Sequence, residues 1–389
     1  MSILLNLSLA IIAILGYYFY PFITLLFFTE SFLTTFEQSD LSNCKSIPEL
    51  KGCEDLAINY DSKFAIFGCP EDYTTNKYWV SKHYNPKTGI PFGKMSHFYA
   101  YDYTQQKAKK LNMIGFPKNI NFAIHGFDII KDDKDSQLNH IYAINHLLGG
   151  LDHIEHFTYK IGSDEVVHKE SITDETFINL NSIVLVTSTS FYISKESENI
   201  SGVSQYLESH GIIGNGKVLY RDTKGELSTV ASKIISANGL ALNYAKDELY
   251  LAENKGGRVW MFTRDIETGE LEVKDKIELS FLPDNIKVDP SSGRIYIAGF
   301  PKTHKVFDYF ENFGKDNLAP IPAIAVRISN ETGDGRFYGK NFKVETLLMD
   351  EQGPMSSLTV IGGIESENRV LLSGLLGPNG MLDCPVDLT

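Results

Sequence analysis

Two histidines on one predicted β-hairpin have the types and the spacing that general base catalysis needs. His125 begins the strand in HGFDII (125–130), and His146 ends the following strand in HIYAINH (140–146). Antiparallel pairing of these strands would bring both imidazoles to the same end of the hairpin. A lone histidine beside a strand is usually structural, but a pair can share the chemistry, with His125 taking a proton from water and His146 orienting it.

The hairpin belongs to a pattern that occurs six times along the chain: a polar residue, an apolar strand, a turn with Asp, Gly or Pro, and a second strand. The repeats start about 45 to 75 residues apart, which predicts an all-β fold, a six-bladed β-propeller. The main structural alternative is a β-sandwich with long loops. The repeats begin at Glu54, His125, Asn181, Asn238, Asp284 and Ser356.

In a propeller, the first residues of the innermost strands meet at one end of the central channel, although they are far apart in sequence. Taken singly, Asn or Asp before a strand is usually a turn residue. Their recurrence at equivalent positions predicts a ring of oxygen donors, which are the ligands that calcium prefers. Zinc is disfavoured because the cysteines do not form ligand pairs and HExxH is absent. We call this set the oxygen ring: Glu54, Asn181, Asn238, Asp284 and Asn285.

A calcium ion in the oxygen ring would polarise a carbonyl group and stabilise the oxyanion that forms when water attacks it. Calcium alone does not deprotonate water efficiently, so His125 would supply the base. The residues therefore predict a metal-assisted hydrolase. The sequence lacks a G-x-S-x-G elbow, which argues against a serine hydrolase.

The chain of 389 residues divides into three predicted parts. Residues 1–28 include an apolar run from Ile3 to Phe28 that is long enough to cross a membrane as a helix. This run has no basic start and no small-residue cleavage site, which favours an uncleaved signal anchor over a cleaved signal peptide. Residues 29–43 are predicted to be a polar stalk, and residues 44–389 the propeller.

The partners and the compartment follow from charge and from this N-terminal segment. A formal net charge of −13 disfavours nucleic acid, because phosphate would be repelled. The segment predicts association with a membrane or lipid, and a catalytic domain that is lumenal or extracellular; secretion is the alternative. Asn199 and Asn330 lie in Asn-x-Ser/Thr sequons that would accept glycans in the secretory pathway.

The four cysteines form an even set that fits disulfides in an oxidising compartment. Cys53 and Cys69 flank a predicted hairpin, so a bridge across its open end is geometrically reasonable. Cys44 and Cys384 lie at the two ends of the body, and a bridge between them would close the chain into a ring. Four buried free thiols are the alternative.

These motifs resemble those of the paraoxonase/arylesterase family, six-bladed propellers that hydrolyse lactones and aryl esters with calcium. CEDLAI, HGFDII, INH, NLNSIV and ANGLAL resemble the family's SEDLEI, HGIS, VNH, NLNDIV and ANGINI in the same order, and PDNIKVDPSSG resembles VDNISVDPETG. The resemblance runs from about Cys44 to Cys384, and the family joins the cysteines at these two places.

The resemblance implies a calcium-dependent hydrolase of a small ester or lactone, with the catalytic calcium in the oxygen ring and a dyad of His125 and His146. It also implies a second, structural calcium on Asp55, the carbonyl of Phe127 and Ser182. The family has an aspartate where this chain has Ser182, which should weaken or remove the second ion unless Asp128 compensates.

The resemblance also implies features of the substrate pocket. Phe300 stands where the family usually has a pocket histidine, so a hydrophobic substrate is expected. Phe307 and Tyr309 match aromatic wall positions. The stretch SQYLESHGII (204–213) resembles the family's lid helix.

Two other functions are consistent with the sequence. One is a propeller enzyme like gluconolactonase or strictosidine synthase, which is disfavoured by the aromatic wall and the lack of a polar cluster for sugars. The other is a lumenal binding module in which calcium is only a structural staple. Hydrolysis of a panel of esters and lactones separates these functions from the first.

Overall fold

The computed structural model describes most of the chain beyond residue 36, and a few isolated positions before it. The side chains of residues 307 and 310–312 are not among those described. The described residues are 8, 12–13, 16, 37–73, 95–147, 151–199, 202–312, 320–333, 335, 341–351, 353–355, 357–376 and 379–388.

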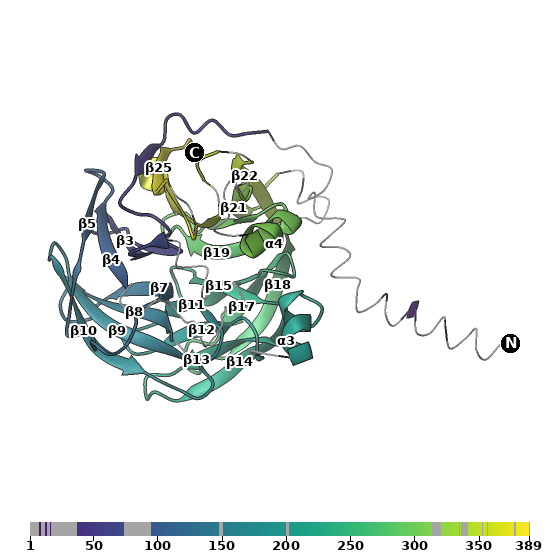
Figure 1. Cartoon of the computed structure of the whole chain (residues 1–389), viewed down its shortest axis with the longest axis horizontal. Coiled ribbons are helices and arrows are strands. Elements are labelled where there is room, and N and C mark those ends of the chain that lie inside the picture. The colour runs from purple at the N-terminus through teal and green to yellow at the C-terminus, as the bar shows by residue number, and fades with distance from the viewer. Residues whose placement is uncertain are drawn as a thin grey trace.

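Six antiparallel sheets are arranged radially around a central hub (Figure 1). Five are four-stranded, and the sheet of blade 2 has a fifth strand, β6, which pairs in parallel with β10. From the hub outward, blade 1 consists of β2 (Asp55–Asn59), β3 (Phe64–Pro70), β4 (Ser96–Asp102) and β5 (Lys107–Lys110). Blade 2 consists of β7 (Ile124–Lys131), β8 (Leu138–His146), β9 (Asp152–Lys160), β10 (Glu165–Ile172) and β6 (Asn112–Ile114). Blade 3 consists of β11 (Leu180–Leu185), β12 (Phe191–Lys195), β13 (Gly216–Arg221) and β14 (Leu227–Ile234). Blade 4 consists of β15 (Ala237–Leu242), β16 (Glu248–Glu253), β17 (Arg258–Arg264) and β18 (Leu271–Glu278). Blade 5 consists of β19 (Leu282–Val288), β20 (Ile295–Phe300), β21 (Ala323–Asn330) and β22 (Phe342–Asp350). Blade 6 consists of β23 (Leu358–Ile364), β24 (Arg369–Gly374), β25 (Met381–Pro385) and β1 (Lys45–Ile47).

The six inner strands form a closed ring. Strand β2 contacts β7, and contacts continue through β11, β15, β19 and β23 back to β2. The predicted all-β, six-bladed propeller is therefore confirmed, and the β-sandwich alternative is wrong. The helices described are short: α3 (Gly202–Ser209), α4 (Thr303–Asn312) and the 3-10 turn η2 (Glu365–Glu367).

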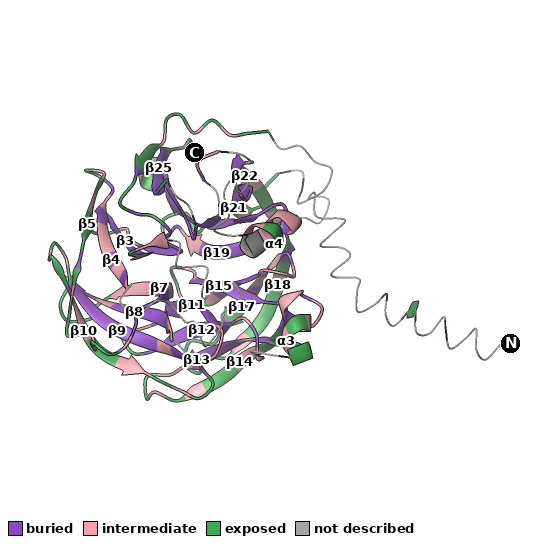
Figure 2. Ribbon diagram, in the orientation of Figure 1, coloured by how far each residue is buried: buried purple, intermediate pink, exposed green. Residues whose placement is uncertain are grey.

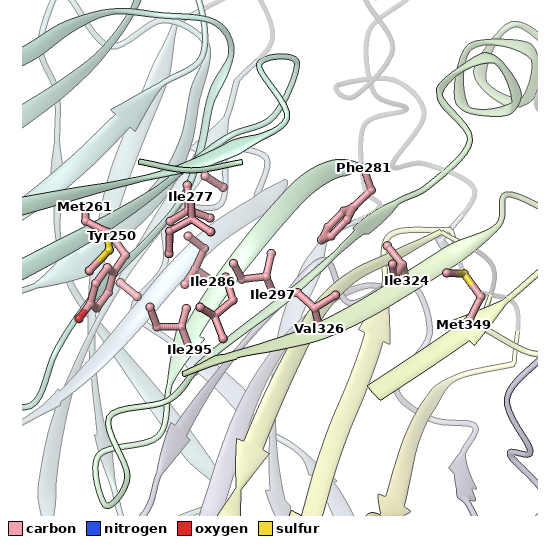
Figure 3. Close-up of a cluster of buried hydrophobic side chains, with 14 residues drawn as sticks. Tyr250, Met261, Ile277, Phe281, Ile286, Ile295, Ile297, Ile324, Val326 and Met349 are labelled. Carbon is pink, nitrogen blue, oxygen red and sulfur yellow. The ribbon is translucent and has the colours of Figure 1, made fainter. Parts of the chain in front are cut away.

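Each sheet packs on its neighbours through apolar side chains, as the contact between blades 4 and 5 shows (Figure 3). Tyr250 and Met261 of blade 4 meet Ile286, Ile297 and Val326 of blade 5 in one buried cluster. Both faces of a blade are covered by other blades, so the inner strands are buried along most of their length. The outermost strands, such as β5 and β18, are mostly exposed or half-buried (Figure 2).

The two ends of the propeller are fastened to each other. Strand β1 pairs with β25, so the first strand of the body completes the last blade. Disulfides join Cys44 to Cys384 and Cys53 to Cys69, so the alternative of four free thiols is wrong. Two disulfides are typical of proteins from an oxidising compartment.

The N-terminal predictions fall mostly outside the described residues. This applies to the signal anchor at 1–28 and to the first part of the stalk at 29–43. In the part of the chain that the structure describes, no helix is long and apolar enough to cross a membrane.

The described end of the predicted stalk, residues 37–43, lies against the propeller. The Ser39 backbone N–H donates to the Met349 carbonyl at 2.8 Å, and the Met349 N–H donates to Ser39 Oγ at 2.8 Å. Gln38 Nε2 donates to Asp350 Oδ1 at 3.0 Å. Residues of this stretch thus contact the end of the outer strand β22 and satisfy part of its open edge.

We expect the two disulfides to stabilise the fold unequally, because the stabilisation grows with the length of chain that a bridge closes. The chain-entropy relation gives about 6 kcal/mol for a sequence separation of 340 and about 3 kcal/mol for one of 16. Denaturant unfolding of the Cys44→Ser/Cys384→Ser protein should therefore show the larger loss, with Cys53→Ser/Cys69→Ser as its matched control. Equal losses would contradict this account.

Candidate active site at the hub of the propeller

The structure brings all five members of the oxygen ring to the hub, where the inner strands begin. Glu54 directly precedes β2, Asn181 and Asn238 are the second residues of β11 and β15, and Asp284 and Asn285 lie in β19. Each exposes 7% or less of its surface. Residues spread over some 230 positions of the sequence thus share one buried site.

A repeated β-bulge presents these side chains to the hub. The pairing of β7 with β8 shifts register between Ile124 and Phe127, so His125 and Gly126 are left out of the regular ladder. A bulge frees residues from the ladder and redirects their side chains. Five of the six inner strands shift register at their start, the other four at 180/183, 237/240, 283/286 and 358/360.

Glycine follows His125 and Asn238 because neighbouring inner strands approach closely there. A Cβ atom on Gly126 would lie 2.4 Å from the carbonyl oxygen of Asn181. A Cβ atom on Gly239 would lie 2.5 Å from the carbonyl oxygen of Asp284. Only glycine lets the backbones come this close, so the His-Gly and Asn-Gly pairs place one inner strand against the next.

Several oxygens of the ring are buried without a hydrogen-bond partner among the described residues. They are Glu54 Oε2, Asn181 Oδ1 and Asn238 Oδ1. Asn285 Nδ2 donates to Glu54 Oε1 at 2.7 Å and so holds the carboxylate in place. Because buried polar atoms are nearly always paired, three unpaired oxygens from three blades fit a hard cation such as calcium.

The charge of the oxygen ring also favours a bound cation. Burial raises the pKa of Glu54 well above its usual value, and the negative charges of Asp55 and Asp284 raise it further. Burial also raises the pKa of Asp284 to about 8. A bound divalent cation would reverse these shifts by favouring the ionised carboxylates. Among the described residues no group of three or more His, Cys, Asp and Glu could hold a metal ion, and the ring itself has only two carboxylates beside its three amides.

The two predicted catalytic histidines are in direct contact beside the ring. His125 Nδ1 lies 2.8 Å from His146 Nε2, and His125 Nε2 lies 3.8 Å from Glu54 Oε1. Burial lowers the pKa of His125 well below its usual value, and the neighbouring His146 lowers it further. His125 is therefore neutral at physiological pH and able to accept a proton.

A third residue, Asp152, continues this arrangement and was missed by the sequence analysis. Its Oδ1 lies 2.6 Å from His146 Nδ1, and its Oδ2 accepts a hydrogen bond from the Leu180 backbone N–H at 2.8 Å. Asp152 begins β9 directly opposite His146 in the register. Pairing of the strand that ends in INH with LDHIEHF could have found it, but the register was not predictable from the sequence.

The implied second calcium site does not fit the structure. Asp55, Phe127 and Ser182 are all buried near the hub. However, Asp55 Oδ1 lies 2.8 Å from Lys287 Nζ, and Ser182 Oγ accepts a hydrogen bond from the Leu240 N–H at 3.1 Å. The carboxylate is thus already paired with a cation of the protein itself.

Two of the residues predicted for the aromatic wall lie in one apolar cluster, and their role in a substrate pocket stays a prediction. Phe300 is buried in an apolar cluster with Leu282 and Ile321, against which Tyr309 packs. Burial raises the pKa of Tyr309 to about 12, so its hydroxyl stays neutral. The side chain of Phe307 lies outside the described residues. The predicted lid stretch 204–213 begins within α3, on which Val203 and Tyr206 are exposed.

The two sequons differ in their surroundings. Asn330 is exposed at the end of β21. At Asn199, the side-chain nitrogen to which a glycan would be attached donates to Glu208 Oε1 at 2.8 Å. Glycosylation stays a prediction at both, and at Asn199 it requires this hydrogen bond to be broken.

The hub defines a propeller with a histidine pair beside a ring of oxygen donors, and comparison with known proteins places it in a family. Residues 89–335 match the family model described as arylesterase. The chain therefore belongs to the arylesterase family, that of the paraoxonases.

The curated relatives are distant. Serum paraoxonase/arylesterase 2 of Rattus norvegicus is 25% identical over 192 residues, which cover 49% of this chain and 53% of the relative. Mechanosensory abnormality protein 6 of Caenorhabditis elegans is 25% identical over 267 residues, covering 67% of this chain and 68% of that protein. The match thus spans about half the length of the paraoxonase. Among solved structures, a luciferin-regenerating enzyme shares the fold with a TM-score of 0.52 and 14% identity, covering 87% of this chain and 94% of its own.

We predict that calcium stabilises the protein through the oxygen ring. Saturating calcium should raise the melting temperature, since a ligand that binds only the folded state adds about 2.7 kcal/mol at a hundredfold excess over Kd. Asn238→Ala removes one unpaired oxygen and should weaken calcium binding at least tenfold in a calorimetric titration. Asn341→Ala, an exposed asparagine away from the hub, is the control, and equal binding by both variants would rule out the ring.

Proposed function

We propose that this protein is a calcium-dependent hydrolase of lactones or aryl esters. The observation that carries the proposal is the chain of contacts from Asp152 through His146 to His125, which ends beside three unpaired buried oxygens. Membership of the arylesterase family supports the reaction class. An arrangement of base and cation is what hydrolysis of a carbonyl compound requires.

We infer a proton position for each imidazole from these contacts. Asp152 accepts from His146 Nδ1–H, so His146 Nε2 accepts from His125 Nδ1–H. We propose that His125 Nε2, which lies 3.8 Å from Glu54 Oε1, is the nitrogen that acts as the base. It takes a proton from the attacking water and returns it to the departing oxygen.

Asp152 and His146 support this step without touching the substrate. When His125 becomes protonated, the positive charge is stabilised by His146 and by the carboxylate of Asp152. The hydrogen bond from the Leu180 N–H fixes that carboxylate to the inner strand of blade 3. Calcium bound by Glu54, Asn181, Asn238, Asp284 and Asn285 would polarise the substrate carbonyl and stabilise the oxyanion.

The substrate is proposed to be hydrophobic, because Phe300 and Tyr309 contribute apolar surface next to β19, the strand that carries two members of the ring. The protein is further proposed to act in the secretory pathway or outside the cell, on a membrane or lipid surface through residues 1–28. Its two disulfides support such a compartment.

A lumenal binding module in which calcium is a structural staple is the second candidate. It is favoured by one observation. The Caenorhabditis elegans relative, whose match covers 67% of this chain, is named for a mechanosensory abnormality and not for an enzymatic activity. This candidate predicts binding of calcium without hydrolysis.

We expect the purified protein to hydrolyse members of a panel of hydrophobic lactones and aryl esters when calcium is present. Chelation should abolish the activity and added calcium should restore it, because the carbonyl is no longer polarised without the ion. His125→Gln should lower kcat by about 100- to 10,000-fold, the contribution of a general base, and leave calcium binding unchanged. Activity that survives chelation would refute this mechanism, and a calcium-binding protein inactive on the whole panel would favour the binding module.

We expect Asp152→Asn to lower kcat by about 10- to 1,000-fold with little change in KM, because the imidazolium loses its stabilising charge. The acidic limb of the pH–rate profile should move to lower pH for the same reason. Asp132→Asn is a matched control, since Asp132 holds His140, and His140 contacts His156, in a similar chain beyond the other end of β7. If both variants kept full activity, Asp152 would have no part in the reaction.

A further inference from the structure

Lys287 extends across the hub of the propeller. It follows Asp284 by three residues on β19, in blade 5, and its Nζ lies 2.8 Å from Asp55 Oδ1 in blade 1. Blade 6 stands between these two blades in the ring, so the ion pair spans the channel. The Lys287 side chain is 16% exposed and that of Asp55 is 1% exposed, so both charges are largely withdrawn from water.

A second carboxylate, that of the half-buried Asp128, lies within the electrostatic influence of this cation. Burial raises the pKa of Asp128, and the positive charge of Lys287 opposes that rise. The ammonium group is therefore ion-paired with Asp55 of blade 1 and acts on Asp128 of blade 2 through its charge alone. We call Lys287, Asp55 and Asp128 the lysine site.

The carboxylate oxygens of the lysine site already accept hydrogen bonds from the backbone. Asp55 Oδ1 accepts from the Leu56 N–H at 2.8 Å. Asp128 Oδ1 and Oδ2 accept from the N–H groups of Ile129 and Leu185, each at 2.8 Å. Asp128 is thus committed to the backbone and does not replace the carboxylate that is missing at Ser182.

The lysine site contrasts with the oxygen ring above it. The ring has three buried oxygens without a partner among the described residues, whereas no side-chain atom of the lysine site is buried and unpaired there. The ring therefore gains from binding a cation. The lysine site is satisfied without one, because its cation is part of the chain.

Two differences from the family's motifs, at Ser182 and Lys287, both make the charge near Asp55 more positive. By the resemblance, Ser182 stands where the family has an aspartate, and Lys287 in DNIKVDP stands at the serine of the family's VDNISVDPETG motif. One negative charge is lost, and a monovalent ammonium stands beside the remaining Asp55 where a divalent ion would require two carboxylates.

We propose that the ammonium group of Lys287 takes the place of the second, structural metal ion, so that this protein binds one calcium and keeps its hub assembled without it. The proposal depends on the calcium site proposed above only for the ion in the oxygen ring. The staple of the fold is then independent of calcium, and removal of calcium stops the reaction without dismantling the hub.

The first test counts the ions bound by the full-length protein. Equilibrium dialysis against calcium, with metal analysis of the protein, should give one ion per chain. Two ions per chain would overturn the proposal. If the protein bound no ion, the calcium-dependent function would be contradicted. The inference that Lys287 keeps a metal ion away from Asp55 would still be supported.

The second test removes the ammonium group. Lys287→Met keeps the length of the side chain and leaves the buried carboxylate of Asp55 without its ion-pair partner, so the melting temperature should fall by about 5 to 10 °C. The fall should be the same with saturating calcium and with a chelator. Lys274→Met is the control, since Lys274 pairs with Glu248 while 48% exposed, and a surface pair contributes little. Identical melting of the two variants would overturn the proposal.

The third test restores the metal site. Lys287→Ser combined with Ser182→Asp removes the ammonium and returns the missing carboxylate, so a second calcium should bind and chelation should lower the melting temperature by more than it does in the unaltered protein. A folded double variant that still binds one ion would contradict the inference. If Lys287→Met fails to fold, the ion count of the unaltered protein and this double variant still decide the matter.

Discussion

The convergence of six inner strands on one hub is the constraint on which the rest of the structure depends. The strands come so close that glycine is required at positions 126 and 239, where any side chain would meet the backbone of the next blade. Such close packing withdraws Glu54 and Asp284 from water and leaves them with raised pKa values. The burial that stabilises the ring of blades therefore also creates the demand for a positive charge.

The hub meets this demand in two ways, at two levels. Near the start of the strands, oxygens without partners favour an exchangeable cation. Beyond them, Lys287 supplies a permanent one to Asp55. A buried ion pair is a weak source of stability in general, but a hub that carries buried carboxylates for another reason must compensate them. Under the proposed function, the ring at the first level serves chemistry and the ion pair at the second serves assembly.

The sequence predicted the elements of the site whose signal lies in local order. Glu54, His125 and Asn238 each stand before an apolar run, and the recurrence of that pattern gave the number of blades and the members of the ring. The disulfide of Cys53 and Cys69 followed from a hairpin. These features need no knowledge of which strand lies opposite which.

The features that the sequence did not predict depend on register and on distance across the hub. Asp152 meets His146 only because β8 and β9 pair as they do. Lys287 in DNIKVDP looks like an ordinary exposed lysine of a strand until Asp55 of blade 1 is placed within reach of it. The bulges at the start of the inner strands were also missed, since a bulge is visible only once both partners are aligned. The sequence predicts a polar stalk at residues 29–43, and a polar stretch gives no sign of the edge strand that its described end contacts.

The bond between Cys44 and Cys384 gives the body of the protein the covalent connectivity of a circle. A protease that cut one exposed turn, such as residues 222–226 between β13 and β14, would open that circle without releasing a fragment, and the blades would keep their neighbours. Such nicked molecules would stay whole until a reductant reached them, which suits a protein exposed to proteolysis outside the cytosol. The same connectivity makes the body a natural candidate for circular permutation, with new termini at that turn.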